Sequence, residues 1–524
     1  MRRRQVLQGG AALLAMPAIA RAQSATTLKF VPYADLALLD PLVSAFVTRN
    51  HVMMVFDTLF SLDEQGVPRP QMLAGHTVED DGRRWTLALR PDLRFHDGTP
   101  VLARDVVASL RRWAVTDSFA QALFDATDEL SAPSDTVVRF RLKRPFPLLP
   151  NALAKPTNLM AAIMPERLAS QPTSKRLTEM VGSGPFQFVA DERVPGARNV
   201  YRRFDGYVPR PDGTPSFAAG PRVAHFDRVE WLTTPDPGTQ IAALQAGEVD
   251  WVEQPVMDLV PSLRQDRRLK LEVIETTGLI GMLRFNHLYP PFDNPALRRV
   301  TLKAVKQRDY MEAVAGENPA IWNDHVGVFP PGNPLATDAG MDLLSGAHAV
   351  AALRQEVAAS GYKGEKITFL IATDVPRIAA ICQVGADMLR QIGLNVDDVA
   401  TDWGTVVQRT NNREPLDHGG WSMFGSFWGG YDFLTPAGYL PLRGNGAAAW
   451  NGWPTSPKLE VLRQEWLLAV DETTQRDIAR RIQLQAWTDV PFLPLGLYYQ
   501  PTAYRADLTG MLKGLPLFTN LRRM

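Results

Sequence analysis

The stretch from Glu79 to Trp113 constrains the fold most, because its hydrophobic period changes along its length. Residues 85–90 alternate between large apolar and polar or small side chains, which is typical of a half-buried strand. A second short strand is predicted at Leu93–His96, and Asp97-Gly98 is a turn signal after it. From Pro100 onward, apolar residues recur at three and four positions, which predicts a helix. Two strands and a helix are therefore expected here.

The same stretch resembles the signature of the peptide/nickel-type (family 5) extracytoplasmic solute-binding proteins of ABC importers. The resemblance is carried by Gly82, Leu89, Arg90, Phe95, His96, Asp97, Gly98, Pro100, Ala103, Asp105, Val106 and Ser109. One departure is Leu102, which stands where the family has Thr or Ser as a helix N-cap. A missing cap typically costs about 1 kcal/mol of helix stability. The departure therefore concerns only the local start of the helix.

Further blocks resemble the same family and occur in the same order. They are the Gly182-Ser183-Gly184-Pro185 turn, the Gly247-Glu248-Val249-Asp250 segment after a helix, Phe285-Asn286, the helix start at Asn294-Pro295, and the proline-bounded strand in residues 490–499. The residue pattern itself predicts strands at 28–31, 136–142 and 366–371 and near Val396, and helices capped by Thr239 and Asn294 and at 375–393 and 478–487. This alternation is typical of sheets covered by helices.

The resemblance implies an α/β fold with two lobes, the type II periplasmic binding-protein architecture, in which strands cross between the lobes. We expect lobe I to comprise residues 26–275 and 490–524, with an extra subdomain near 64–180, and lobe II to comprise 276–489. The late strand in 490–499 is expected to return to lobe I. Ligand would bind between the lobes and drive a hinge closure by binding the closed form more tightly.

The first 22 residues have the features of an export signal. Basic residues at the start precede a mostly apolar run, Val6–Ala20, that is too short to span a bilayer. Ala20-Arg21-Ala22 fits a small-x-small cleavage pattern. Arg3-Arg4-Gln5-Val6-Leu7 resembles the twin-arginine motif, and an ordinary Sec signal is the alternative. Both routes predict a periplasmic protein, cleaved after Ala22, and without a nearby Cys for a lipid anchor.

The net charge and the single cysteine limit which partners and cross-links the mature protein can have. Removing residues 1–22 deletes four arginines and no acid, which changes the formal charge from +0 to −4. A mildly acidic protein has no overall field that attracts nucleic acid or anionic lipid. The single Cys382 excludes an internal disulfide, and its apolar helical surroundings predict a buried structural thiol. We expect a monomer that binds no nucleic acid.

Motifs of known catalytic or cofactor chemistry are missing from the sequence. No two of the eight His lie within five positions, so paired helical zinc ligands are absent. Ser422 lacks the second glycine of a nucleophile elbow, and no P-loop occurs. Gly444–Ala449 matches a dinucleotide pattern without its βαβ context. Glu248 and Asp250 are interpreted as turn and edge residues. We therefore expect no catalytic residue, no metal site, no cofactor and no enzymatic activity.

Aromatic residues crowd into 403–466, which holds six of the 12 Trp. Together with the glycines of 419–430, they favour a ligand-binding surface, and an aromatic core under a loop is the alternative. In peptide-binding members of the family, a Trp-Gly-x-Asp-like segment here faces the ligand, and its Asp pairs with the peptide amino terminus. The nearest equivalents are Trp428 and Asp432, with Tyr431 making the spacing one residue longer. The candidate ligand-binding residues are Trp428, Asp432, Tyr431, Trp421, Trp450, Arg443 and, from the N-terminal loop, Tyr33.

The resemblance implies a substrate-binding component that delivers a small solute to the permease and ATPase of an ABC importer. A peptide is the first expectation for the solute. Nickel chelates, opines and sugars are alternatives, and a periplasmic hydrolase on the same scaffold is a rival of another class. A hydrolase needs a nucleophile with a base within reach, and the sequence offers no such motif.

Overall fold

The chain folds into two compact units, each built on its own sheet. The computed structural model describes residues 26–43, 45–157 and 159–524. Unit 1 takes the described residues up to Thr276 and then Pro501–Met524, and unit 2 is Thr277–Gln500. The predicted first boundary lies one residue from the observed one. The predicted return at 490 is too early, because β18 (Phe492–Tyr498) pairs with β13 (Leu279–Phe285) inside unit 2. The predicted signal, residues 1–22, lies outside the described residues.

Unit 1 contains a seven-stranded sheet in the order β12-β19-β11-β1-β10-β9-β8. The strands are β1 (Thr27–Val31), β8 (Phe186–Phe188), β9 (Arg198–Arg203), β10 (Arg228–Leu232), β11 (Trp251–Val252), β12 (Leu269–Glu272) and β19 (Thr502–Arg505). Only β1 has parallel partners on both sides, β10 and β11. Helix α7 (Pro237–Ala246) connects β10 to β11 and ends at Gly247, whose φ is 76°. Its N-cap is Asp236 and not Thr239, because the Asp236 carboxylate accepts from the Thr239 amide at 2.7 Å.

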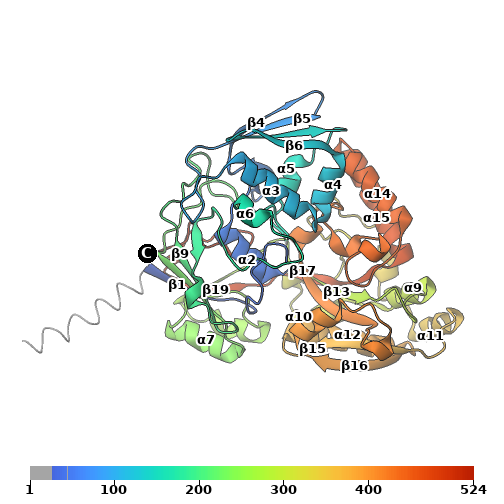
Figure 1. The fold of residues 1–524 in the computed structure, drawn as a ribbon. Helices are drawn as coiled ribbons and strands as arrows, with labels where there is room; N and C mark the ends of the chain where they lie inside the picture. Colours follow the sequence, from blue (N-terminus) through green and yellow to red (C-terminus); the bar gives the residue numbers. More distant parts are fainter. Residues whose placement is uncertain (1–25, 44, 158) are drawn as a thin grey trace, which may run out of the picture. The chain divides into compact units, whose positions relative to one another are not determined.

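A separate four-stranded sheet, in the order β4-β5-β7-β6, lies within unit 1 (Figure 1). Its strands are β4 (Leu73–Glu79), β5 (Arg84–Leu89), β6 (Thr127–Ser134) and β7 (Val137–Leu142), and helices α3 (Ala103–Ala114) and α4 (Ser118–Ala126) contact it. Helix α3 begins without a side-chain cap at Leu102, but the Asp105 carboxylate accepts from the Leu102 amide at 2.8 Å. The predicted strand at 93–96 is wrong, because only Arg94 forms an isolated bridge there, with Pro100.

Two of the sequence landmarks contact each other in unit 1. His96 Nε2 lies 3.0 Å from the Gly184 carbonyl, and His96 Nδ1 accepts from the Gly182 amide at 3.3 Å. The glycines lie against the end of α2 (Phe46–Val55), where a Cβ on Gly182 would lie 2.1 Å from the Val55 carbonyl oxygen. Burial lowers the pKa of His96 to about 4. His96 is thus a neutral residue that holds this turn.

Unit 2 contains a six-stranded sheet in the order β14-β18-β13-β17-β15-β16. Its other strands are β14 (Trp322–Asn323), β15 (Lys366–Ala372), β16 (Asn395–Thr401) and β17 (Met423–Gly429). Strand β15 is parallel to β16 and β17, whereas β13 is antiparallel to β17 and β18. Helix α12 (Pro376–Gln391) contacts β15, β16 and β17 (Figure 1). It carries Cys382, which is buried as predicted, and burial raises the pKa of its thiol to about 12.

The remaining elements complete the two units. They are β2 (Phe60–Leu62), β3 (Pro68–Pro70), α5 (Leu149–Ala154), α6 (Glu166–Ala169), α8 (Val260–Leu263), α9 (Pro295–Ala304), α10 (Gln307–Ala315), α11 (Val350–Ala359), α13 (Trp403–Arg409), α14 (Pro457–Leu468), α15 (Glu472–Asp489), β20 (Leu508–Thr509) and β21 (Arg522–Arg523). Asn294 caps α9 as predicted, accepting from the Ala296 amide at 2.9 Å. Within the described ranges, no helix is both long and apolar enough to cross a membrane.

The glycine-rich segment around Trp428 forms a central strand, which the sequence pattern did not predict. Every residue of β17 is buried. At Gly425 a Cβ would lie 2.6 Å from Cys382 Sγ, so the glycine lets α12 approach the sheet closely. These glycines therefore serve packing within β17, and the loop that follows the strand begins only at Gly430.

Candidate functional site

In unit 2, three strands end at one edge of the sheet. Leu279 at the start of β13 pairs with Gly429 at the end of β17 and with Tyr498 at the end of β18. Because β15 runs parallel to β17, its carboxyl end lies at the same edge. Ligands of open α/β sheets bind outside the carboxyl ends of the strands. This edge of unit 2 is therefore the first place to look for a ligand site.

Two of the predicted ligand-binding residues lie in the turn that follows β17 at this edge. Tyr431 and Asp432 belong to a single turn of 3-10 helix, Gly430–Phe433. Both are buried, with 8% and 6% of their surface exposed. The Gly430 amide donates to the Gly278 carbonyl at 2.9 Å. A Cβ on Gly430 would lie 2.4 Å from the Thr277 carbonyl oxygen. The turn is thus held closely against the start of β13.

Trp428 and Trp450 contact each other beside this turn. Their ring centroids lie 5.1 Å apart at 88°, and the Trp428 ring also stacks on Phe433 at 6.1 Å. Trp428 Nε1 donates to Ser426 Oγ at 3.2 Å, so its polar atom is directed along the strand. Trp450 is half-buried, whereas Trp428 is buried. The structure therefore brings together four of the seven predicted residues.

Trp421 and Arg443, two further predicted residues, make their contacts inside unit 2, through aromatic packing and an ion pair. Trp421 precedes the amino end of β17, is 1% exposed and packs against Phe424 and Trp453. Arg443 is paired within the unit, since its Nε lies 3.3 Å from a carboxylate oxygen of Glu460. The Arg443 side chain is therefore largely buried and paired, and not a solvated surface residue. The sequence-based reasoning did not anticipate the pairing.

Arg284 was missed by the sequence reasoning and supports Trp450 from within unit 2. It is 0% exposed, and its guanidinium carbon lies 5.1 Å from the Trp450 ring centroid. It donates to four backbone carbonyls, those of Trp450, Asn451, Pro441 and Pro491, at 2.7–3.2 Å. Burial lowers the pKa of Arg284 to about 9, so it stays charged at neutral pH. Its hydrogen bonds fix the loop that carries Trp450.

In unit 1, the corresponding edge lies at the carboxyl ends of β1 and β11. Tyr33 follows β1, and its amide donates to Glu253 Oε2 at 2.9 Å. Glu253 follows β11, and its other oxygen accepts from Asn50 Nδ2 of α2 at 3.2 Å. The Tyr33 ring meets the Phe46 ring edge-on at 6.4 Å. Tyr33, the seventh predicted residue, thus lies where α2 approaches the ends of these strands.

Arg49 lies in the same turn of α2 and was also missed. It is 6% exposed, and its guanidinium carbon lies 4.8 Å from the Phe46 ring centroid. Over residues 26–43, 45–157 and 159–524, its side chain makes no hydrogen bond or ion pair, and Nε and Nη1 are both buried. The sequence carries no signal for this state, because an Arg in an amphipathic helix ordinarily lies at the surface.

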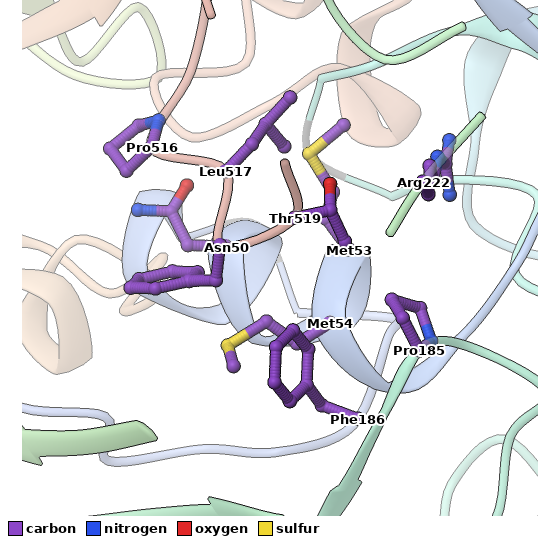
Figure 2. Close-up of a pocket in the computed structure, with 10 residues that line it drawn as sticks. Asn50, Met53, Met54, Pro185, Phe186, Arg222, Pro516, Leu517 and Thr519 are labelled. Carbon is purple, nitrogen blue, oxygen red and sulfur yellow. The ribbon is translucent and has the colours of Figure 1, made fainter. Parts of the chain in front are cut away.

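The enclosed space inside unit 1 is too small to hold a solute. A cavity of about 10 Å³ has room for one water molecule. Figure 2 shows that its lining residues come from α2, the C-terminal segment and neighbouring segments. The cavity is lined by Asn50, Met53, Met54, Pro185, Phe186, Arg222, Pro516, Leu517, Phe518 and Thr519. A surface depression of about 480 Å³ near Phe204 is lined by Arg203, which is paired with Asp205 and Asp227. In the part of the chain that the structure describes, no cluster of His, Cys, Asp or Glu could hold a metal ion.

The model of the bacterial extracellular solute-binding proteins, family 5, matches residues 67–450. The chain belongs to this family. The assignment made from the sequence is thereby confirmed. This family 5 protein is 36% identical, over 99% of its chain and 98% of the relative, to the probable peptide ABC transporter periplasmic-binding protein of Sinorhizobium fredii. It is 24% identical to the glutathione-binding protein of Pectobacterium atrosepticum, over 87% of this chain and 85% of that one.

Solved structures confirm the predicted α/β fold of two-lobed periplasmic binding proteins. The periplasmic binding protein AgaA from A. tumefacien R10, in complex with agropinic acid, matches with a TM-score of 0.79 at 20% identity, over 95% of this chain and 99% of that chain. DppA from Helicobacter pylori, in complex with the peptide STSA, matches with a TM-score of 0.78 at 18% identity, over 95% and 98%. At these identities, the likeness concerns the fold of the family 5 chain and not its ligand.

Proposed function

We propose that this protein is the periplasmic ligand-binding component of an ABC importer and that its solute is a peptide. The observation that carries the proposal is the Asp432 carboxylate, which is 6% exposed just beyond the end of the central strand β17. A carboxylate at this edge suits the ammonium group of a peptide amino terminus, since a charge-assisted hydrogen bond is about twice as strong as a neutral one. The Sinorhizobium fredii relative, named as a peptide-binding protein, supports the same reading.

Trp428, Tyr431 and Trp450 would supply the apolar contact beside Asp432. Large aromatic rings offer rigid surface at a low entropy cost, and they tolerate varied side chains of a peptide. Arg284 fixes the carbonyl groups around Trp450, so this wall is formed before ligand arrives. Trp421 and Arg443 are left out of the proposed site, because the interior of unit 2 and Glu460 account for their contacts.

Ligand identity is tested by native mass spectrometry of protein purified gently from the periplasm. A co-purified mass that matches a peptide, and that titrates back into stripped protein by calorimetry, is the expected result. A co-purified opine or metal chelate would replace the peptide in the proposal. Peptide recovered in cleaved form after incubation would instead favour the hydrolase reading.

The role of Asp432 is tested by Asp432→Asn, which keeps the shape and removes the charge. We expect at least a tenfold loss of affinity for peptide, because one partner of a buried charge pair is lost. Asp212→Asn, at a carboxylate whose side chain is 75% exposed, is the matched control and should leave affinity unchanged. Equal binding by wild type and Asp432→Asn would remove Asp432 from the site.

We also propose that residues 1–22 direct export through the twin-arginine route and are removed after Ala22. Cell fractionation and N-terminal sequencing of the mature protein test both points. Arg3→Lys combined with Arg4→Lys should retain the precursor in the cytoplasm if the route is twin-arginine, and should leave export intact if the route is Sec.

A further inference from the structure

Arg49 differs from every other buried arginine of the described chain. The other six are Arg90, Arg112, Arg222, Arg284, Arg298 and Arg463, and each donates at least two hydrogen bonds to a carbonyl, hydroxyl or carboxylate oxygen. Within residues 26–43, 45–157 and 159–524, the Arg49 guanidinium has no such partner. Arginine keeps its charge at neutral pH, so a buried guanidinium without an acceptor is unfavourable.

The surroundings of Arg49 explain why its charge is not neutralised within unit 1. Glu253 is an acid at this edge, and its two oxygens accept from the Tyr33 amide and from Asn50 Nδ2, while no ion pair joins it to Arg49 within the described residues. The guanidinium carbon lies over the Phe46 ring at 4.8 Å from its centroid, within the distance of a cation–π contact. The Oδ1 atom of Asn50 is also buried without a partner. The turn Phe46–Asn50 thus presents a buried cation without an internal anion.

The turn Phe46–Asn50 lies beside the carboxyl end of a parallel strand, which is where open α/β sheets bind ligands. Strand β1 is the only strand of the seven-stranded sheet with parallel neighbours on both sides, and Tyr33 follows its carboxyl end. Tyr33 contacts Phe46, on which Arg49 rests. The unpartnered cation therefore lies at the carboxyl ends of the parallel strands, where open α/β sheets bind ligands.

We propose that Arg49 binds the terminal carboxylate of the solute, with Phe46 and Tyr33 forming the aromatic support of this anion subsite. The planar guanidinium matches the geometry of a carboxylate and would recover the hydrogen bonds that it lacks in the free protein. The inference rests on the proposed function in one respect, namely that the solute is a peptide with a free carboxyl end.

Equilibrium dialysis with two defined peptide pools tests the proposal. Both contain tripeptides randomised over uncharged residues; one has free carboxyl ends, and the other has C-terminal amides. Wild-type protein should retain the free-acid pool about a hundredfold more tightly than the amide pool. Arg49→Gln should bind the free-acid pool as weakly as wild type binds the amide pool, and Arg49→Lys should fall between. Arg104→Gln, which removes an exposed charge of α3, controls for net charge and should match wild type.

Two outcomes overturn the subsite and leave peptide binding standing. One is equal retention of the two pools by wild type, and the other is unchanged affinity of Arg49→Gln for the free-acid pool. Circular dichroism and the melting temperature of each variant exclude misfolding as the reason for a loss. Because Arg49→Gln removes an unpaired buried charge, its melting temperature without peptide should equal or exceed that of wild type.

Retention of neither pool by wild type would overturn the proposed function and not the subsite. Arg49 is then tested by titrating sodium succinate into wild-type protein and following the Nε–H signal that disappears in Arg49→Gln. A saturable shift of that signal supports an anion subsite for another carboxylate solute. An unmoved signal overturns the subsite.

Discussion

Arg284 in unit 2 and Arg49 in unit 1 are both buried arginines, but they differ in the number of hydrogen-bond acceptors around the guanidinium. Arg284 donates to four backbone carbonyls under Trp450, whereas Arg49 rests on Phe46 and makes no hydrogen bond or ion pair with the described residues. Burial of a charged side chain is therefore not in itself a sign of function. Arg284, with acceptors for its donors, holds the scaffold, whereas Arg49 has buried donors without acceptors, which is the basis of the proposed anion subsite.

The largest expected effect is that of Arg284→Met. The substitution leaves four buried carbonyls without their donor and removes the support of Trp450. We expect the free energy of unfolding to fall by about 3–5 kcal/mol. Denaturant unfolding followed by tryptophan fluorescence measures it. Arg308→Met, at an exposed ion pair with Glu312, is the control and should change stability by less than about 1 kcal/mol. A loss as small as the control's would mean that Arg284 is not a scaffold residue.

Arg49→Met should change the free energy of unfolding in the opposite direction to Arg284→Met. The Met side chain keeps an apolar stem over Phe46 and removes a buried charge without acceptors. We expect the free energy of unfolding without peptide to rise by about 1–3 kcal/mol. The same denaturant titration measures it, and added peptide should reverse the order of the two proteins. A loss like that of Arg284→Met would contradict the comparison on which the anion subsite rests.

His96 is a fully hydrogen-bonded, largely buried residue that, unlike arginine, can lose its charge near neutral pH. His96 has both ring nitrogens engaged, at Gly184 and Gly182, and burial lowers its pKa to about 4. Because the folded pKa is below the unfolded value of about 6.5, the unfolded chain binds more protons, and stability falls as pH drops from 6.5 towards 4.

The contribution of His96 to this loss should be about 1 kcal/mol between pH 7 and 5.5. His96→Gln keeps a donor and an acceptor and does not titrate, so its stability should depend less on pH over this window. Denaturant midpoints at several pH values measure the difference. An unchanged slope would show that the pKa of His96 is the same in the folded and the unfolded protein.

The sequence predicted those features that depend on local pattern. The spacing of apolar residues located β15, α12 and α9, with Asn294 as a cap. It missed β17, because the glycines that allow α12 to lie against Gly425 weaken the strand pattern. Asp432 was found through the family resemblance. The state of Arg49 could not be predicted, because it depends on which groups the oxygens of Glu253, about 200 residues later, accept hydrogen bonds from in the folded chain.

The smallest expected effect is that of Arg443→Gln, which tests whether an internal partner is enough to exclude an arginine from the ligand site. Arg443 lies 3.3 Å from a Glu460 oxygen, and Glu460 keeps Arg463 at 2.8 Å and the Gly444 amide at 2.7 Å when Arg443 is lost. The carboxylate therefore stays paired, so the free energy of unfolding should fall by less than about 1 kcal/mol. Peptide affinity should equal that of wild type in the dialysis used for Arg49→Gln. If Arg443→Gln weakened peptide binding as much as Arg49→Gln, possession of an internal partner would no longer separate scaffold arginines from ligand-binding ones.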